Sequence, residues 1–158
     1  MFTTSKEEKF FLSFLKKTDL VLEYGSGEST KQIADLVKKV LSIEHQEDWF
    51  NKIKSELPSN AEVILKKPLT KYIEEGNDGT YDQFKDYAEY PISHGPFDVI
   101  LIDGRARVYC ASICKKLGHK NTIVFIHDFT RQEYQESLNY LEIIDYCDSM
   151  YKFKIKEI

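Results

Sequence analysis

The stretch Val21-Leu22-Glu23-Tyr24-Gly25-Ser26-Gly27-Glu28-Ser29-Thr30 decides how this chain is expected to fold. The apolar residues 20–22 are typical of a buried strand, and an acidic residue and a glycine turn follow them. Beyond this turn, apolar residues recur every three or four positions as far as Val40, as they do along one face of a helix. The stretch therefore predicts a strand over about 20–24, a tight turn, and a helix over about 29–39.

The two glycines of this turn, Gly25 and Gly27, suit a backbone that must approach a ligand closely. Glycine bends tightly because it has no Cβ. The N-terminus of the helix that follows offers unpaired N–H groups and a partial positive charge. A strand, a glycine turn and a helix in this order are typical of the first unit of a nucleotide-binding α/β sheet. The alternative is that the glycines only close a tight turn.

Acidic residues at the ends of predicted strands favour the ligand-binding interpretation. Glu23 directly precedes the first glycine, Glu44 ends a second predicted strand over about 40–44, and Asp103 follows a strand over about 97–102. The carboxyl ends of parallel strands lie along one edge of a sheet, where open α/β sheets bind their ligands. We therefore expect these three carboxylates to surround one crevice.

Length, charge and cysteine usage limit the class of protein. The 158 residues suffice for one domain with a substantial core, so we expect a single domain over 1–158. The net charge of −4, without a basic stripe, argues against a nucleic-acid partner, and no apolar run is long enough to cross a membrane. The N-terminus lacks the pattern of a signal peptide, and the three cysteines suit free thiols in a reducing compartment. These features predict a cytoplasmic protein.

The remaining elements complete an α/β pattern. The segment 69–96 is the least regular, and we interpret it as a flap with a short helix near 80–88. Its aromatic residues suit a carbohydrate or small polar ligand, and they equally suit the packing of an ordinary helix. The alternation of strands and helices predicts a parallel sheet with helices on both faces, closed by an antiparallel hairpin. The other predicted elements are helices after Ser5, between His45 and Pro58, over 106–117 and over 131–141, and strands over 61–65, 122–126, 143–146 and 151–155.

Together these residues resemble a class I S-adenosylmethionine-dependent methyltransferase. The resemblance rests on Glu23-Tyr24-Gly25-Ser26-Gly27, on Glu44 and Asp103 at two strand ends, and on the closing hairpin. It covers nearly the whole chain. It implies a single Rossmann-like sheet of seven strands in the order 3-2-1-4-5-7-6, with the last strand antiparallel, and S-adenosylmethionine as the cofactor.

The resemblance also implies cofactor contacts. The glycine turn would lie beside the methionine part of the cofactor, and Glu44 would accept hydrogen bonds from both ribose hydroxyls, as suits an ionised carboxylate. His45 would flank the adenine. The sequence departs from the family at Ser29, which replaces a frequent third glycine, and at Lys67-Pro68-Leu69, where an acid or amide often meets the adenine. The predicted cofactor-binding residues are Glu23, Tyr24, Gly25, Ser26, Gly27, Ser29, Thr30, Glu44, His45 and Asp103.

Asp103 and Asp128 are the main candidates for catalysis, because they follow neighbouring strands near the place of the transferred methyl group. In the catechol-type O-methyltransferases, similarly placed acids hold a divalent metal, so these two residues could bind Mg²⁺ or Mn²⁺. Phe129 departs from that pattern, which tends to have Asn there. Without a metal, Asp103, Asp128 or His127 would act as the general base. His127 could instead be a satisfied core imidazole.

The acceptor is predicted from the segment Asp103-Gly104-Arg105-Ala106-Arg107, which resembles that of small sugar O-methyltransferase domains. Arg105 would bind oxygens of the substrate or pair with a neighbouring acid, whereas Arg107 would form an ion pair. In such a reaction an oxygen attacks the methyl group in line, and the protein aligns the two and removes one proton. We therefore predict methyl transfer to a hydroxyl of a small molecule or glycan, with a sugar as the preferred acceptor.

Two other functions fit part of the pattern. A NAD-dependent oxidoreductase also combines a Gly-x-Gly turn with an acid that binds ribose, but Glu23 and the closing hairpin argue against it. A non-catalytic Rossmann-fold scaffold would need neither the carboxylates nor a cofactor. The sequence does not indicate the oligomeric state.

Overall fold

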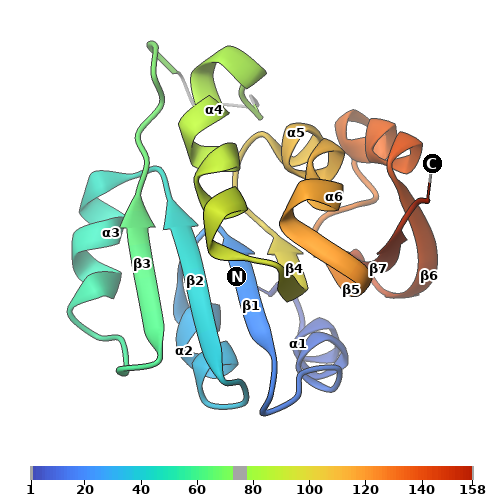
Figure 1. Ribbon diagram of the computed structural model, residues 1–158, viewed down its shortest axis with the longest axis horizontal. Coiled ribbons are helices and arrows are strands. Elements are labelled where there is room, and N and C mark those ends of the chain that lie inside the picture. The colour runs from blue at the N-terminus through green and yellow to red at the C-terminus, as the bar shows by residue number, and fades with distance from the viewer. Residues whose placement is uncertain (1, 73–77, 158) are drawn as a thin grey trace.

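Residues 2–72 and 78–157 are described by the computed structural model, and within them seven strands form one sheet in the order β3-β2-β1-β4-β5-β7-β6 (Figure 1). β7 runs antiparallel to both of its neighbours, whereas the pairs among β1 to β5 are parallel. The predicted strand order is therefore confirmed. The strands are β1 (Leu20–Tyr24), β2 (Lys39–Glu44), β3 (Ala61–Leu65), β4 (Phe97–Ile102), β5 (Gly118–Ile126), β6 (Leu141–Cys147) and β7 (Met150–Ile155).

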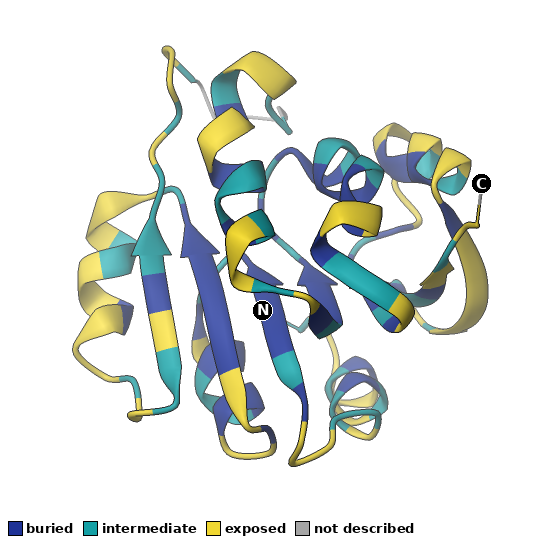
Figure 2. Ribbon diagram, viewed as in Figure 1, coloured by how far each residue is buried: buried dark blue, intermediate teal, exposed yellow. Residues whose placement is uncertain are grey.

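Helices cover both faces of this sheet, because successive side chains of each strand point to opposite faces. On β1, Val21 joins a core with Phe11 and Ile33, while Leu22 joins a core with Phe84 on the other face. The central strands are buried along most of their length, whereas the loops, the outer faces of the helices and β6 hold many of the exposed positions (Figure 2). The helices are α1 (Ser5–Leu12), α2 (Glu28–Ala34), α3 (Glu47–Lys54), α4 (Tyr81–Glu89), α5 (Arg107–Ser112), α6 (Cys114–Leu117) and the 3₁₀ helices η1 (Tyr90–His94) and η2 (Gln132–Asn139).

Several element boundaries differ from the predicted ones. The helix predicted over 29–39 ends at Ala34, where the Asn60 amide donates to the carbonyl of Ala34 and to that of Val37. The helix predicted over 106–117 is two helices that meet at Ile113. The helix predicted over 131–141 is the 3₁₀ helix η2. These ends depend on tertiary hydrogen bonds and packing, which override local propensity.

The segment 69–96 holds α4, which packs across the sheet. Phe84, Tyr87 and Ala88 of α4 are fully buried, and the Tyr24 hydroxyl donates to the Ala88 carbonyl at 2.6 Å. Ordinary helix packing therefore accounts for Phe84 and Tyr87, whereas Tyr81 stays exposed. Residues 73–77 of the predicted flap lie outside the described residues.

The helices within residues 2–72 and 78–157 are all too short or too polar to serve as a membrane span.

Candidate active site at the carboxyl ends of the strands

A polar cleft of about 190 Å³ lies at the carboxyl ends of β1, β2 and β4. Its walls come from the turn between β1 and α2, from the end of β2 with the start of α3, and from the turn between β4 and α5. Two of the three predicted carboxylates, Glu44 and Asp103, therefore share one cleft. The lining residues are Gly25, Ser26, Glu44, His45, Gln46, Trp49, Asp103, Gly104, Arg105 and Arg107.

The glycine turn is held against the β4–α5 turn. Gly25 has a φ of +94°, and a Cβ there would lie 2.7 Å from the Asp103 carbonyl oxygen and 2.9 Å from the Gly104 Cα. Gly27 has extended backbone, and a Cβ there would make only ordinary contact with Trp49, at 3.7 Å. Glycine is thus required at Gly25 by both conformation and space. At Gly27 a Cβ would fit against the Trp49 ring, so glycine is not required there.

Glu23 lies beneath the cleft and is fully buried. Its carboxylate accepts hydrogen bonds from the hydroxyls of Ser29 (2.6 Å), Thr30 and Ser42 (2.8 Å). Burial raises the pKa of Glu23 to about 7, although all three hydrogen bonds act to lower it. The three hydroxyls come from α2 and β2, so Glu23 ties both elements to β1.

Five of the ten predicted cofactor-binding residues therefore do not line the cleft. Glu23, Ser29 and Thr30 form the buried cluster beneath it. Tyr24 is buried among the core residues on the face that α4 covers. Of the ten predicted positions, Gly25, Ser26, Glu44, His45 and Asp103 do line the cleft, and Gly27 borders it through Trp49.

Glu44 is held rigidly at the end of β2 and is nearly buried, with 3% of its surface exposed. Its carboxylate accepts hydrogen bonds from the backbone N–H groups of Ser26 (3.0 Å), His45 (3.0 Å) and Gln46 (2.9 Å). A carboxylate has about four acceptor positions. The backbone fills three of them, and the His45 Nδ1 atom lies 3.3 Å from the same carboxylate. Glu44 thus fixes the glycine turn and also presents an anionic acceptor to the cleft.

The predicted catalytic residues meet at the ends of β4 and β5. The His127 Nδ1 atom lies 3.1 Å from Asp103 and 3.6 Å from Asp128, and Nε2 lies 3.4 Å from Glu7. Burial acts to lower the pKa of His127, but its hydrogen bond to Asp103 and the three nearby carboxylates outweigh burial and raise that pKa. Burial likewise acts to raise the pKa of Asp103, and its hydrogen bond to His127 and the charge of Arg107 outweigh burial and lower it.

Asp103, His127 and Asp128 also have the side-chain spacing of a metal cluster, since one N or O atom from each lies within 4.8 Å of the other two. However, the Arg107 guanidinium lies 3.6 Å from Asp103 and 3.8 Å from Asp128. A protein cation therefore already stands between the two carboxylates. As arranged here, these residues do not fit Mg²⁺ or Mn²⁺, and the predicted metal site is not supported.

Sequence reasoning missed three residues that line the cleft, Gln46, Trp49 and Gly104, and it predicted only an ion pair for Arg107. Trp49 is the single tryptophan of the sequence, and its indole N–H donates to the Ser26 carbonyl. Trp49 is the third residue of α3, which begins shortly after β2 ends at Glu44. Its spacing of five residues from Glu44 was the signal that could have placed it at the cleft. Arg107 does form the predicted ion pair, with Asp103.

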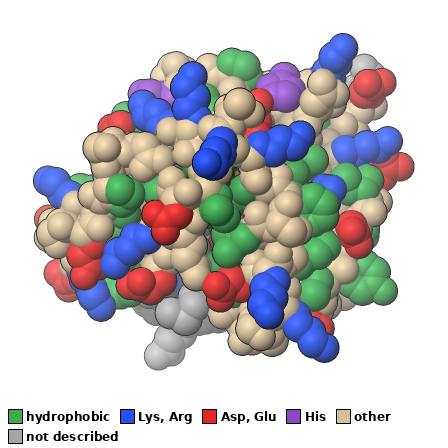
Figure 3. Space-filling view, turned by 90° about the horizontal axis from the view of Figure 1, so that it is seen from below, with side chains coloured by type: hydrophobic (Ala, Val, Ile, Leu, Met, Phe, Trp, Pro, Cys, Tyr) green, Lys and Arg blue, Asp and Glu red, His purple; other side chains and the backbone are tan. Residues whose placement is uncertain are grey.

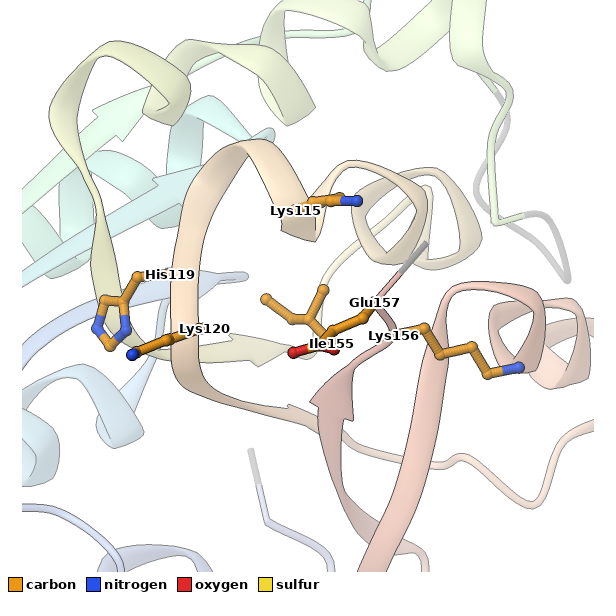
Figure 4. A pocket seen from close by; sticks show the side chains of 6 residues that line it. All are labelled: Lys115, His119, Lys120, Ile155, Lys156 and Glu157. Atoms are coloured by element: carbon orange, nitrogen blue, oxygen red, sulfur yellow. The ribbon is translucent and has the colours of Figure 1, made fainter.

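A larger pocket, of about 440 Å³, lies elsewhere, between α6, the start of β5 and the end of β7 (Figure 4). Ile155 and Glu157 lie near its centre, Lys120 lies beside His119, and the Lys156 ammonium points away from the pocket. Seen from the amino ends of the parallel strands, the surface has basic and acidic side chains interspersed (Figure 3). Ligands of open α/β sheets bind at the carboxyl ends of the strands, so the smaller cleft is the better candidate site.

Known structures identify the fold. A methyltransferase-like protein from Silicibacter pomeroyi superposes with a TM-score of 0.77 at 23% identity, covering 99% of this chain and 88% of that one. A TehB-like S-adenosylmethionine-dependent methyltransferase from Corynebacterium glutamicum gives 0.60 at 11% identity, covering 98% and 89%. This chain has the class I methyltransferase fold.

One further structure with this fold is named for an RNA acceptor. The tRNA (m1A58) methyltransferase TrmI from Aquifex aeolicus superposes with a TM-score of 0.60 at 12% identity, covering 98% of this chain and 70% of that one. Comparison with protein-family models and with curated protein sequences gives no match. Identities this low establish the fold, and the reaction has to be inferred from the cleft itself.

Proposed function

We propose that the protein transfers a methyl group from S-adenosylmethionine to a hydroxyl of a small polar acceptor. The observation that carries this proposal is the position of Glu44. It is fixed by three backbone N–H groups at the end of β2, across the glycine turn from Asp103, in a methyltransferase fold. A rigid anionic acceptor at this strand end is suited to the hydroxyls of a ribose.

The cofactor would bind along the glycine turn. Glu44 accepts a hydrogen bond from the ribose, the Gly25–Gly27 backbone faces the methionine part, and His45 flanks the adenine. Acidic groups around the cleft favour the cationic sulfonium over the neutral product. The cleft is smaller than the roughly 300–1,000 Å³ of typical ligand pockets, so part of the nucleoside would lie above its rim. Glu23, Ser29 and Thr30 would act indirectly, by holding β1, α2 and β2 together.

Asp103 would contact the acceptor hydroxyl, because it lines the cleft beside the glycine turn. Its lowered pKa makes it a weak base, so it mainly orients the hydroxyl and takes the proton as the methyl group moves. His127 and Asp128 would hold Asp103 and its charge in place. Arg105, at the rim of the cleft, would bind a second oxygen of the acceptor. A carboxylate beside a guanidinium favours a sugar, which offers several hydroxyls at short spacing.

Methyl transfer from labelled S-adenosylmethionine to separate sugar, phenol and RNA acceptors tests this proposal. We expect label on a sugar hydroxyl, with EDTA present throughout. Transfer to RNA alone would keep the methyltransferase assignment and reject the small acceptor. Preferential binding of NAD over S-adenosylhomocysteine, with no transfer to any acceptor, would support the oxidoreductase alternative. Failure to bind either cofactor would support a scaffold.

A further inference from the structure

Arg107 is a buried cation at the centre of the catalytic cluster. Arg107 is only 6% exposed, although it is the first residue of helix α5. Its Nε atom donates to the Gly104 carbonyl at 3.0 Å, and Nη1 donates to the His127 carbonyl at 2.6 Å. Its guanidinium carbon lies 4.8 Å from the centre of the Tyr134 ring. The planar fork is therefore fixed by the backbone of two strand ends and by one aromatic ring.

The backbone of Arg107 is fixed as well. Its N–H donates to the Asp78 carboxylate at 2.8 Å, and the preceding residue, Ala106, has a left-handed φ of +50°. Helix α5 therefore begins at Arg107, directly after the turn that lines the cleft. The Arg107 side chain points back toward the end of β4, where it meets the Gly104 carbonyl. A lysine would not reproduce these contacts, because it lacks the rigid fork that meets two carbonyls at once.

This geometry puts a permanent positive charge between the two acidic groups. The guanidinium nitrogens lie 3.6 Å from Asp103 and 3.8 Å from Asp128. A guanidinium is not deprotonated in proteins. A divalent cation placed among the same oxygens would meet this charge at close range, in a largely buried site where repulsion is poorly screened.

The ring of His127 is also engaged by the protein itself. Nδ1 faces Asp103 at 3.1 Å, and Nε2 lies 3.0 Å from the Thr3 hydroxyl and 3.4 Å from Glu7. A metal could bind the ring only if His127 gave up one of these partners. The three groups that have metal-like spacing are thus already bridged by hydrogen bonds and a guanidinium.

We propose that Arg107 takes the place that a divalent metal would otherwise occupy between Asp103 and Asp128, so that the protein works without one. The role of Arg107 in catalysis rests on the proposed function. The arrangement of charges around Arg107 does not depend on it. Arg107 is a positioning residue: it holds Asp103 toward the acceptor and balances its charge. An acceptor then needs one hydroxyl at Asp103 and no second oxygen to chelate a metal.

Mn²⁺ binding, followed by electron paramagnetic resonance, tests this inference without any methyl transfer. We expect wild-type protein to show no bound Mn²⁺ at millimolar concentration. Arg107→Gln should bind Mn²⁺ at a concentration at least tenfold below the highest one at which the wild type shows no binding, and Asp128→Asn added to it should abolish the gain. Arg131→Gln is the matched control, because Arg131 lies 3.4 Å from Asp128 on the exposed side and Arg107 remains in place.

Two outcomes would overturn the inference. One is Mn²⁺ binding to the wild type that Asp128→Asn removes, a result that needs no Arg107 variant to fold. The other is a folded Arg107→Gln protein that binds Mn²⁺ no better than the wild type. If that variant does not fold, the wild-type titration and its Asp128→Asn control decide alone. Because neither measurement involves the cofactor, failure here is distinct from failure of the proposed methyl transfer.

Discussion

At the scale of single residues, the two glycines of the β1–α2 turn have different tasks. Gly25 adopts a left-handed conformation and leaves no space for a Cβ, since backbone atoms of Asp103 and Gly104 lie within 2.9 Å of its position. Gly27 has neither restriction. The sequence predicted that both glycines would be needed in the turn. It could not show that a Cβ is excluded at Gly25 and tolerated at Gly27. That difference depends on a neighbour almost 80 positions away in the chain.

Gly25→Ala should therefore unfold or strongly destabilise the protein, by about 2 kcal/mol or more, because it adds strain and a backbone clash. Gly27→Ala should keep within about 1 kcal/mol of the wild-type stability while weakening cofactor binding, since its methyl group intrudes beside Trp49. Urea unfolding measures the first effect, and quenching of Trp49 fluorescence by the cofactor measures the second. Equal stabilities of the two variants would refute the steric argument.

Asp103→Asn should reduce methyl transfer by roughly 10²- to 10⁴-fold, because it removes the group that orients the acceptor and accepts its proton. The affinity for S-adenosylhomocysteine should change much less. Steady-state kinetics beside a binding titration separate the two effects. Equal losses in turnover and in affinity would assign Asp103 to cofactor binding.

At the scale of elements, Glu23 ties together β1, β2 and α2 through three hydroxyls. The sequence indicated an acid at this strand end, because parallel strands bring their carboxyl ends to one edge. It did not indicate that the side chain points under α2, where Ser29 and Thr30 enclose it. Similarly, acids after β4 and β5 suggested a metal, and the side chain of Arg107, four residues beyond Asp103, changes that interpretation. Side-chain direction, more than strand order, limited the prediction.

Glu23→Gln should change how stability depends on pH. The folded pKa of about 7 is raised above the ordinary 4.5, so the wild type is favoured most below pH 4.5 and loses that contribution as pH rises through 7. A shift of this size corresponds to about 3 kcal/mol. The neutral amide has no such dependence, so the variant should gain stability relative to the wild type between pH 5 and pH 8. Urea unfolding at pH 5 and at pH 8 measures the free energy of unfolding of both proteins. A difference between variant and wild type that is the same at both pH values would contradict a buried, titrating Glu23.

At the scale of the whole molecule, the N-terminal helix reaches the proposed catalytic residues Asp103, His127 and Asp128. Glu7 accepts hydrogen bonds from the backbone and hydroxyl of Ser149, and it lies 3.4 Å from His127. Segments more than a hundred residues apart thus support one site, and no local pattern revealed this. The alternation of strands and helices did predict the sheet, because right-handed parallel connections leave few other arrangements.

The binding of S-adenosylhomocysteine to the wild type and to Glu44→Ala, measured by titration calorimetry, tests the central claim most directly. We predict that the wild type binds it in preference to NAD. Glu44→Ala should weaken this binding about ten- to a hundredfold, since it deletes a charged hydrogen-bond acceptor. Circular dichroism controls for folding, because Glu44 also holds three backbone N–H groups. A folded Glu44→Ala protein with unchanged affinity, or a wild type that prefers NAD, would contradict the account.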